Sequence, residues 1–327
     1  GVAVVGEAGD GEEALSVVAE TRPDVVTMDV EMPGMGGLEA VERLMEETPT
    51  PVLMLSAHTD EGAEVTFEAL DRGAVDFFAK PGGEVSTGVS RESERLVEAV
   101  RSVADADLDA ATRERDDPSA AASRSPGAAS EADAADVDGP LTVVIAASTG
   151  GPNAVERVLS ALPMADCRVV IVQHMPEAFT SRFANRLDEA SAYDVREASD
   201  GARIGAGEAL VARGGSHTRI DSYRSGRLRV KLDEDDDSHT VTPAADVTMR
   251  SAAEVIDDPL VGVVLTGMGS DAAEGIRAMA DAGAYTLAQS EDTCVIYGMP
   301  KRAVETGGVD AVCDLDDVAG AIVGGEA

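Results

Sequence analysis

Three polar side chains that together can perform acyl-transfer chemistry stand after three separate apolar segments. Ser148, His174 and Asp271 each follow, within a few residues, a segment that is almost entirely apolar. Such segments are typical of strands buried in a parallel sheet, and ligands bind at the edge formed by the carboxyl ends of those strands. A hydroxyl nucleophile needs a base within hydrogen-bond reach, and the base needs an acid that orients it. The sequence therefore predicts a hydrolytic triad, with Ser148 as nucleophile, His174 as base and Asp271 as orienting acid.

Each of these residues also has an ordinary structural interpretation. Ser148 or Thr149 would then cap the following helix or form a phosphate-binding turn, and a lone His174 would be a structural histidine. Asp271 with Glu274 resembles a variant of the capping box. The coincidence of three such residues at three strand ends favours the triad over three unrelated structural roles.

Other groups are weaker candidates for chemistry. Cys294 is a rival nucleophile, but it lies in an apolar, strand-like segment where we expect it to pack. His239 follows a run of aspartates and is expected to be solvated, and His217 follows a glycine turn and receives no role. No metal site is predicted, because Cys167, Cys294 and Cys313 are widely spaced along the chain.

The composition of the 327-residue chain excludes several classes of protein. The formal net charge is −36 and lysine is almost absent, so a nucleic-acid partner is not expected. Regular apolar periodicity argues against disorder and favours a folded protein adapted to high salt, where a short Debye length screens self-repulsion. No apolar run is long enough to span a membrane and no signal-peptide pattern opens the chain. We therefore expect a cytoplasmic protein without membrane insertion.

Strands and helices alternate through residues 1–104, which predicts a flavodoxin-like α/β domain with a parallel sheet. Asp29, Ser56 and Lys80 end three of its strands at one edge, where a carboxylate, a hydroxyl and an ammonium group can together handle a phosphoryl group. Taken singly, each is an ordinary polar residue at a strand end. The predicted strands are 2–5, 25–29, 51–55 and 75–79, and the predicted helices are 10–20, 38–45, 61–72 and 91–104.

The stretches DVEMPGMGG, which starts at Asp29, and FFAKP, which starts at Phe77, resemble the response-regulator receiver domain. The resemblance implies phosphorylation of Asp29 by a histidine kinase, switch roles for Ser56 and Phe77, and contact of Lys80 with the phosphoryl group. Receivers also begin with a strand that ends in paired acids for Mg²⁺ and with a helix, and neither precedes the segment 2–5. We therefore expect an incomplete receiver in which Mg²⁺ binding and phosphorylation are weak.

Periodicity stops over 105–140, a segment rich in Ala, Asp and Ser, which predicts a disordered acidic linker. Residues 141–327 form the second predicted domain, a doubly wound α/β fold. Its predicted strands are 141–147, 168–173, 209–212, 228–232, 260–265, 284–288 and 294–297. One predicted helix follows the Ser148 turn directly, and the others occupy 180–187, 243–254, 272–282 and 315–323.

Four motifs of this second domain, ASTGG, QHMP, LTGMGSD and YGMP, resemble the chemotaxis protein-glutamate methylesterase (CheB) family. The resemblance implies hydrolysis of glutamate methyl esters on chemoreceptors with release of methanol, deamidation of receptor glutamines, and an esterase that needs no cofactor. It assigns Ser148, His174 and Asp271 to the triad and places Met268 and Thr149 at the oxyanion hole.

The family often has an arginine before the proline that matches Pro243, whereas this chain has Thr242. Two other classes of function stay open at this point. One is a general hydrolase of small esters. The other is a scaffold of the chemotaxis array that is regulated by its receiver and has no catalytic activity.

Overall fold

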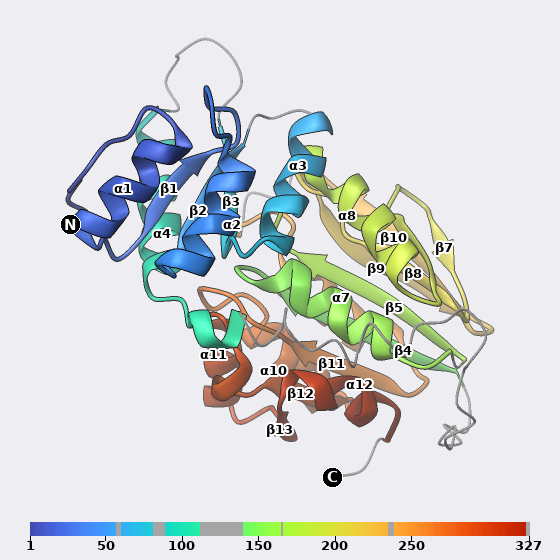
Figure 1. Ribbon diagram of the computed structural model, residues 1–327. Helices are drawn as coiled ribbons and strands as arrows, with labels where there is room; N and C mark the ends of the chain where they lie inside the picture. The colour runs from blue at the N-terminus through green and yellow to red at the C-terminus, as the bar shows by residue number, and fades with distance from the viewer. Residues whose placement is uncertain (57–59, 81–88, 112–139, 165, 235–238, 325–327) are drawn as a thin grey trace. The chain divides into compact units, whose positions relative to one another are not determined.

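The computed structural model describes residues 1–56, 60–80, 89–111, 140–164, 166–234 and 239–324. The chain forms two compact units, Gly1–Arg115 and Asp116–Ala327. Each unit contains a parallel sheet with helices packed on it (Figure 1), as the sequence predicted for an α/β protein. None of the described helices is both long enough and apolar enough to cross a membrane.

The first unit has a three-stranded parallel sheet in the order β1-β2-β3. The Asp10 side chain caps the first helix by accepting the N–H of Glu13 (2.9 Å), which fixes where that helix begins. The strands are β1 Val26–Asp29, β2 Val52–Ser56 and β3 Asp76–Ala79. The helices are α1 Gly11–Thr21, α2 Gly37–Glu47, α3 Asp60–Asp71 and α4 Val89–Ala104.

The predicted strand at 2–5 is wrong. Val2, Val4 and Val5 are 50 %, 77 % and 58 % exposed, and the segment is irregular. A strand needs a hydrogen-bonded neighbour, and among the described residues no strand lies beside this segment, since β1 pairs with β2. A short apolar run is therefore not sufficient to predict a strand here.

The start of the predicted linker belongs to the first unit. Residues 108–111 are helical and Ala110 is 2 % exposed, so this part of 105–140 is ordered. The Asp107 side chain accepts the N–H groups of Asp109 and Ala110 at 2.9 and 3.0 Å, as a capping residue does. Residues 112–139, on which most of the linker prediction falls, lie outside the described residues.

The second unit has a seven-stranded sheet in the order β13-β12-β11-β4-β5-β8-β6, and every neighbouring pair is parallel. A small antiparallel sheet, β7-β10-β9, accompanies it. The strands are β4 Leu141–Ala147, β5 Cys167–Gln173, β6 Asp194–Glu197, β7 Arg203–Ile204, β8 Glu208–Val211, β9 His217–Arg224, β10 Arg227–Asp233, β11 Leu260–Val264, β12 Tyr285–Gln289 and β13 Ala311–Cys313. The helices are α7 Gly151–Ala161, α8 Glu177–Ala190, α9 Ala245–Val255, α10 Ala273–Asp281, α11 Met299–Glu305 and α12 Leu315–Gly324, with a 3₁₀ turn at Glu291–Thr293.

Helices cover both faces of the large sheet (Figure 1). Helices α8 and α12 pack against α7, whereas α9 and α11 pack against α10. Strand β4 lies between β5 and β11, and the chain leaves β4 toward β5 but later returns to its other side as β11. Open α/β sheets bind their ligands at the carboxyl ends of the strands beside such a reversal.

Strands β4 and β5 are buried along their whole length because their residues are almost all apolar, apart from Thr142, Arg168 and Gln173. The two strands pair in register from Leu141 with Cys167 to Ala147 with Gln173. Their next residues therefore leave the sheet at the same level, about 5 Å apart.

Several elements of the second unit were not predicted from the sequence, and one predicted strand is wrong. Strands β6, β7, β9 and β13 and helix α11 were not predicted; β7 and β13 are only two and three residues long. The predicted strand at 294–297 is wrong: the segment is irregular, with a single bridge from Tyr297 to Gly267. Its apolar residues Cys294, Val295 and Ile296 are buried without belonging to the sheet.

Helices α9 and α10 approach closely because Gly275 has no side chain. A Cβ atom at this position would lie 2.7 Å from the Cβ of Met249 and 3.0 Å from the Cα of Asp246. Both atoms belong to rigid parts of α9, so neither can move without shifting the helix.

We predict opposite effects for the same substitution at two helical glycines. Gly275→Ala should lower the free energy of unfolding by about 1–3 kcal/mol through overpacking. Gly320→Ala in α12 should leave it unchanged or raise it by up to about 1 kcal/mol, because alanine favours the helix and no atom lies within 4 Å of its Cβ. Urea titration in molar KCl measures both values, and equal effects at the two sites would contradict the packing described here.

Candidate active site

Ser148 lies in a tight turn between β4 and α7. Its N–H donates to the carbonyl of Thr266 at 3.0 Å, which joins the turn to the segment after β11. Gly150 has φ +75°, and a Cβ there would lie 2.8 Å from the Cβ of Val295, so the turn requires glycine on two counts. Helix α7 has Gly150 as its N-cap and no capping bond from a side chain. The interpretation of Ser148 or Thr149 as a helix cap is therefore wrong.

His174 follows β5 and contacts Asp271, which follows β11. The Nε2 atom of His174 lies 2.7 Å from Oδ2 of Asp271, and the two side chains are only 14 % and 11 % exposed. The N–H of His174 also donates to the carbonyl of Ala147 at 3.1 Å, directly before Ser148. The structure thus brings all three predicted triad residues to one edge of the sheet.

Two backbone N–H groups at the start of α9 bind the carboxylate of Asp271. Ala245 donates to Oδ2 at 2.6 Å and Asp246 donates to Oδ1 at 3.1 Å. Burial raises the pKa of Asp271, but the hydrogen bond and charge of His174 together with these two N–H groups outweigh it and hold the pKa below its usual value. Helix α10, which follows Asp271, has no side-chain cap, so the capping-box interpretation is wrong.

The ionised state of Asp271 fixes the proton on His174. An ionised carboxylate only accepts hydrogen bonds, so Nε2 of His174 must be the donor. In the neutral imidazole this leaves Nδ1 as the basic nitrogen. The hydroxyl of Ser148 has no hydrogen-bond partner among the described residues. Catalytic hydrogen bonds are often long before substrate binds, so the lack of a bond from Ser148 to His174 is compatible with a triad.

A glycine brings the segment after β11 against Ser148. A Cβ at Gly267 would lie 2.7 Å from the Cβ of Ser148, and one at Gly298 would lie 2.6 Å from the carbonyl oxygen of Gly267. Met268 follows Gly267, and Thr149 follows Ser148. The N–H groups of Met268 and Thr149 donate to no backbone group in the described part of the chain. Both donors are therefore available to an oxyanion near Ser148.

Gln173 supports the site, although the sequence analysis gave it no role. Its side chain is 2 % exposed, and its Nε2 donates to the carbonyls of Ser148 and His174 at 2.8 and 3.3 Å. The signal in the sequence was a buried amide at the end of an otherwise apolar strand, since such a group must find hydrogen-bond partners.

The cysteines do not form a second catalytic centre. Cys294 is 2 % exposed, and burial raises the pKa of Cys167 to about 11, which suppresses its thiolate. Cys313 lies in the edge strand β13, and burial likewise raises its pKa. His239, expected to be solvated, is half-buried, with its ring 5.4 Å from that of His217.

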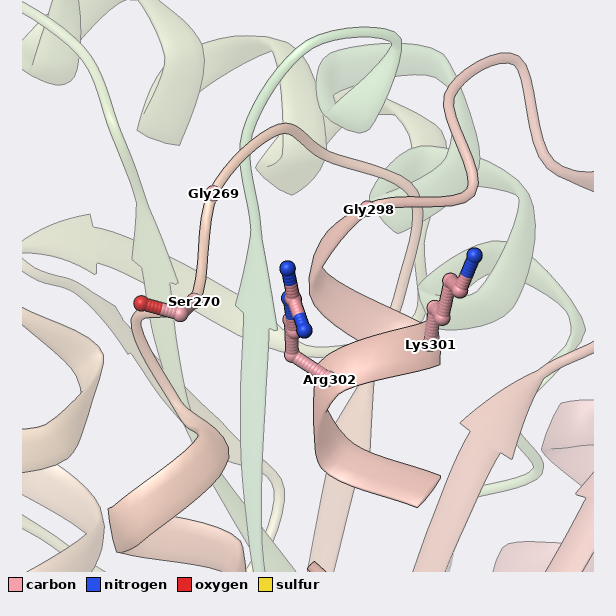
Figure 2. Close-up of a pocket in the computed structure, with 5 residues that line it drawn as sticks. All are labelled: Gly269, Ser270, Gly298, Lys301 and Arg302. Carbon is pink, nitrogen blue, oxygen red and sulfur yellow. The ribbon is translucent and has the colours of Figure 1, made fainter. Parts of the chain in front are cut away.

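A pocket borders the segment that carries Met268 and Asp271. Figure 2 shows Arg302 pointing into the space between Gly298 and the segment Gly269–Ser270, with Lys301 beside it on α11. The pocket is open and holds about 530 Å³. Arg302 pairs with Glu305 at 2.7 Å, whereas Lys301 has no ion-pair partner among the described residues. Positive charge next to the site is notable in a chain whose net charge is −36.

The first unit brings Asp29 and Lys80 together, as predicted. Lys80 Nζ lies 2.5 Å from Oδ2 of Asp29, and both side chains are about 40 % exposed (43 % and 39 %). Ser56 is fully buried: its hydroxyl donates to the carbonyl of Gly62 at 3.1 Å and accepts from Thr66 at 2.7 Å.

Phe77, the other predicted switch residue, contacts an aromatic side chain of α3. Phe77 packs its ring edge-on to Phe67, with centroids 6.3 Å apart. In the part of the chain that the structure describes, no group of three or more His, Cys, Asp or Glu side chains could hold a metal ion.

The fold and the site define a two-unit α/β protein that joins a receiver-like sheet to a hydrolase-like sheet with Ser, His and Asp at its edge. The family model described as CheB methylesterase matches residues 143–322, and the response regulator receiver domain matches residues 1–86. The chain belongs to the CheB methylesterase family.

Named relatives agree with this assignment. The chain is 57 % identical over 336 residues to the protein-glutamate methylesterase/protein-glutamine glutaminase of Haloarcula marismortui, covering 99 % of this chain and 90 % of that protein. It is 56 % identical over 323 residues to the protein of the same name from Halobacterium salinarum, covering 98 % and 91 %. The catalytic domain of Thermotoga maritima CheB methylesterase has a TM-score of 0.55 and 34 % identity, covering 57 % of this chain and all of that domain. The first two relatives are haloarchaeal, which fits the acidic composition of a halophilic protein.

We predict a pH-dependent cost for Asp271→Asn. Asparagine cannot accept both N–H groups of α9 as a carboxylate does, so the free energy of unfolding at pH 7 should fall by roughly 1.5–3 kcal/mol. Because the folded pKa is lowered, the contribution of ionised Asp271 is complete above its unfolded pKa of about 3.9 and is lost as the pH falls through the folded value. The difference between the two proteins should therefore be constant above about pH 5 and shrink in more acidic buffer.

Urea titration from pH 7 to pH 3 in molar KCl measures this difference. Asp281→Asn is the matched control, because Asp281 is 61 % exposed and pairs with Arg277 on the helix surface. Its effect should stay below about 1 kcal/mol at every pH. A cost for Asp271→Asn that does not change with pH would contradict the lowered pKa.

Proposed function

We propose that this chain hydrolyses the methyl esters of glutamate side chains on chemoreceptors, with release of methanol, and deamidates receptor glutamines in the cytoplasm. The observation that carries the proposal is the buried contact between His174 and Asp271 beside Ser148 at the edge of the sheet. The names of the relatives support the same substrate class. No metal or other cofactor is needed for the steps that follow.

In the proposed first half-reaction, the Ser148 oxygen attacks the ester carbonyl while its proton passes to Nδ1 of His174. Asp271 stabilises the resulting imidazolium, and the N–H groups of Met268 and Thr149 bind the oxyanion. Collapse breaks the bond to methoxide, which takes the proton from His174 and leaves as methanol. The product is an ester between the substrate carboxyl group and Ser148.

The second half-reaction regenerates the enzyme. A water molecule gives a proton to Nδ1 of His174 and attacks the acyl carbon, and the same proton returns to the Ser148 oxygen as the acyl bond breaks. Deamidation follows the same course with ammonia as the leaving group. Lys301 and Arg302, beside this site, favour an acidic polypeptide substrate, since the rest of the chain repels one.

The triad predicts a large difference between two nucleophilic candidates. Ser148→Ala and His174→Ala should each lower methanol release from methylated receptor by about 10³-fold or more. Cys294→Ala, the matched control for a buried thiol, should retain activity close to that of the wild type. Gas-chromatographic methanol assay of the three variants provides the test, and near-normal turnover by Ser148→Ala would exclude the hydrolase mechanism. Free methyl esters assayed in parallel identify a general small-ester hydrolase if they are turned over as fast as receptor.

We further propose that the first unit restrains the esterase and that phosphorylation of Asp29 by a histidine kinase relieves the restraint. The ion pair between Asp29 and Lys80 supports this role, since a phosphoryl group on Asp29 would change the partner of Lys80. We also propose that this chain is phosphorylated slowly, since the described residues include no group of three or more His, Cys, Asp or Glu side chains that could hold a metal ion.

Removal of the first unit should therefore raise basal methanol release several-fold, because a restraint carried by residues 1–140 is absent from residues 141–327. Phosphoryl incorporation from a small phosphodonor should be weak in the full chain and absent in Asp29→Asn. The full chain and the fragment are compared at equal concentration in molar KCl. Equal basal activity would refute the restraint, and strong Mg²⁺-dependent labelling of Asp29 would show that the metal site is complete.

A further inference from the structure

The start of α9 has no capping side chain of its own. Its N-cap is Ala244, which offers no acceptor, and both Ala244 and Ala245 are fully buried. The first N–H groups of a helix need acceptors from outside the helix, and leaving them unpaired in a buried position is costly. The acceptors here are supplied by two residues that are distant in the sequence, His217 and Asp271.

His217 supplies the first of these acceptors. It is 1 % exposed at the start of β9, and its Nδ1 accepts the N–H of Ala244 at 3.1 Å. A ring nitrogen that accepts a hydrogen bond carries no proton, so Nδ1 of His217 is unprotonated in this arrangement. The next two N–H groups, of Ala245 and Asp246, bind the carboxylate of Asp271.

The two bonds are mechanically linked because the Ala244 N–H and the Ala245 N–H belong to successive peptide units that meet at the Cα of Ala244. The position of the first unit restricts the second, which sets the direction of the Ala245 N–H and hence the position of Asp271. Further along the first turn, the Asp246 carboxylate accepts the N–H of Gly275 at 2.6 Å and so fixes α9 to α10. The start of α9 is thereby held from β9 on one side and from α10 on the other.

We propose that His217 is a positioning residue for the esterase. Its unprotonated Nδ1 holds the start of α9, whose N–H groups orient Asp271 toward His174. The inference rests on the proposed function for its effect on turnover, and its effect on the backbone can be measured separately. The bond of His217 is to the backbone of α9 and not to a triad side chain, so it acts through the two peptide units that meet at Ala244. It is the second histidine that the hydrolytic site requires.

Three variants test this role. His217→Leu removes the acceptor with a side chain of similar size. His217→Asn keeps an acceptor oxygen near the position of Nδ1. Tyr193→Phe is the control for stability, because it removes hydrogen bonding by a buried hydroxyl outside α9, including the bond to the Pro163 carbonyl (3.0 Å).

Two readouts are expected to change together. His217→Leu should lower kcat by roughly 10- to 100-fold with KM within twofold, since a small displacement of a catalytic group affects the chemical step. His217→Asn should restore kcat to within about threefold of the wild type, and Tyr193→Phe should leave it unchanged. Hydrogen exchange of the peptide that contains Ala245 and Asp246 should speed up at least tenfold in His217→Leu and not in the other two.

The outcomes separate this inference from the proposed function. The inference is overturned if His217→Leu leaves both kcat and exchange as in Tyr193→Phe, or if His217→Asn is no better than His217→Leu. If exchange responds as expected while the wild type and Ser148→Ala release methanol equally, the positioning contact stands and the proposed esterase fails.

Discussion

The hydrogen bond between Nε2 of His174 and the carboxylate of Asp271 is the contact on which the proposed mechanism of the second unit depends. It forms only because three independent arrangements coincide. The register of β4 with β5 places His174 level with Ser148, the reversal of chain direction brings β11 to the other side of β4, and the start of α9 turns Asp271 inward. A change in any of these arrangements would leave a buried carboxylate or imidazole without its partner, which is more costly than the loss of an exposed pair.

High salt makes such short, buried contacts more important. At molar ionic strength the Debye length is about 3 Å, so charges separated by solvent hardly influence one another. Hydrogen bonds that exclude water, as between His174 and Asp271, keep their strength under these conditions. The many acidic side chains on the surface therefore carry solubility, and the chemistry rests on a few buried groups and on glycines that let backbone segments meet. Gly267 and Gly298 are such glycines, because a Cβ at either would separate the segment of Met268 from Ser148 or α11.

Much of this arrangement could be predicted from the sequence, because long apolar segments give strands and the residues after them share an edge. Ser148, His174 and Asp271 lie at the edge where they were predicted, as do the strands β4, β5 and β11, whereas their catalytic roles stay a prediction. The acceptor role of His217 and the cap that Asp271 provides for α9 could not be predicted, since both join residues about 26 or more positions apart. The prediction at 2–5 failed for a related reason: a short apolar run suggests a strand, but a strand forms only beside a neighbouring strand. The segment at 294–297 failed because burial there serves packing against the Ser148 turn and not sheet formation.

The most direct measurement of the central claim is the position of the proton on His174. Nitrogen-15 NMR of the imidazole in the wild-type protein near pH 7.5, assigned with His174→Ala, distinguishes a protonated from an unprotonated ring nitrogen. We predict a proton on Nε2, directed at Asp271, and an unprotonated Nδ1 that serves as the base for Ser148. A neutral ring with its proton on Nδ1 would contradict this prediction, because the nitrogen beside Asp271 would then be unable to donate and Ser148 would have no base.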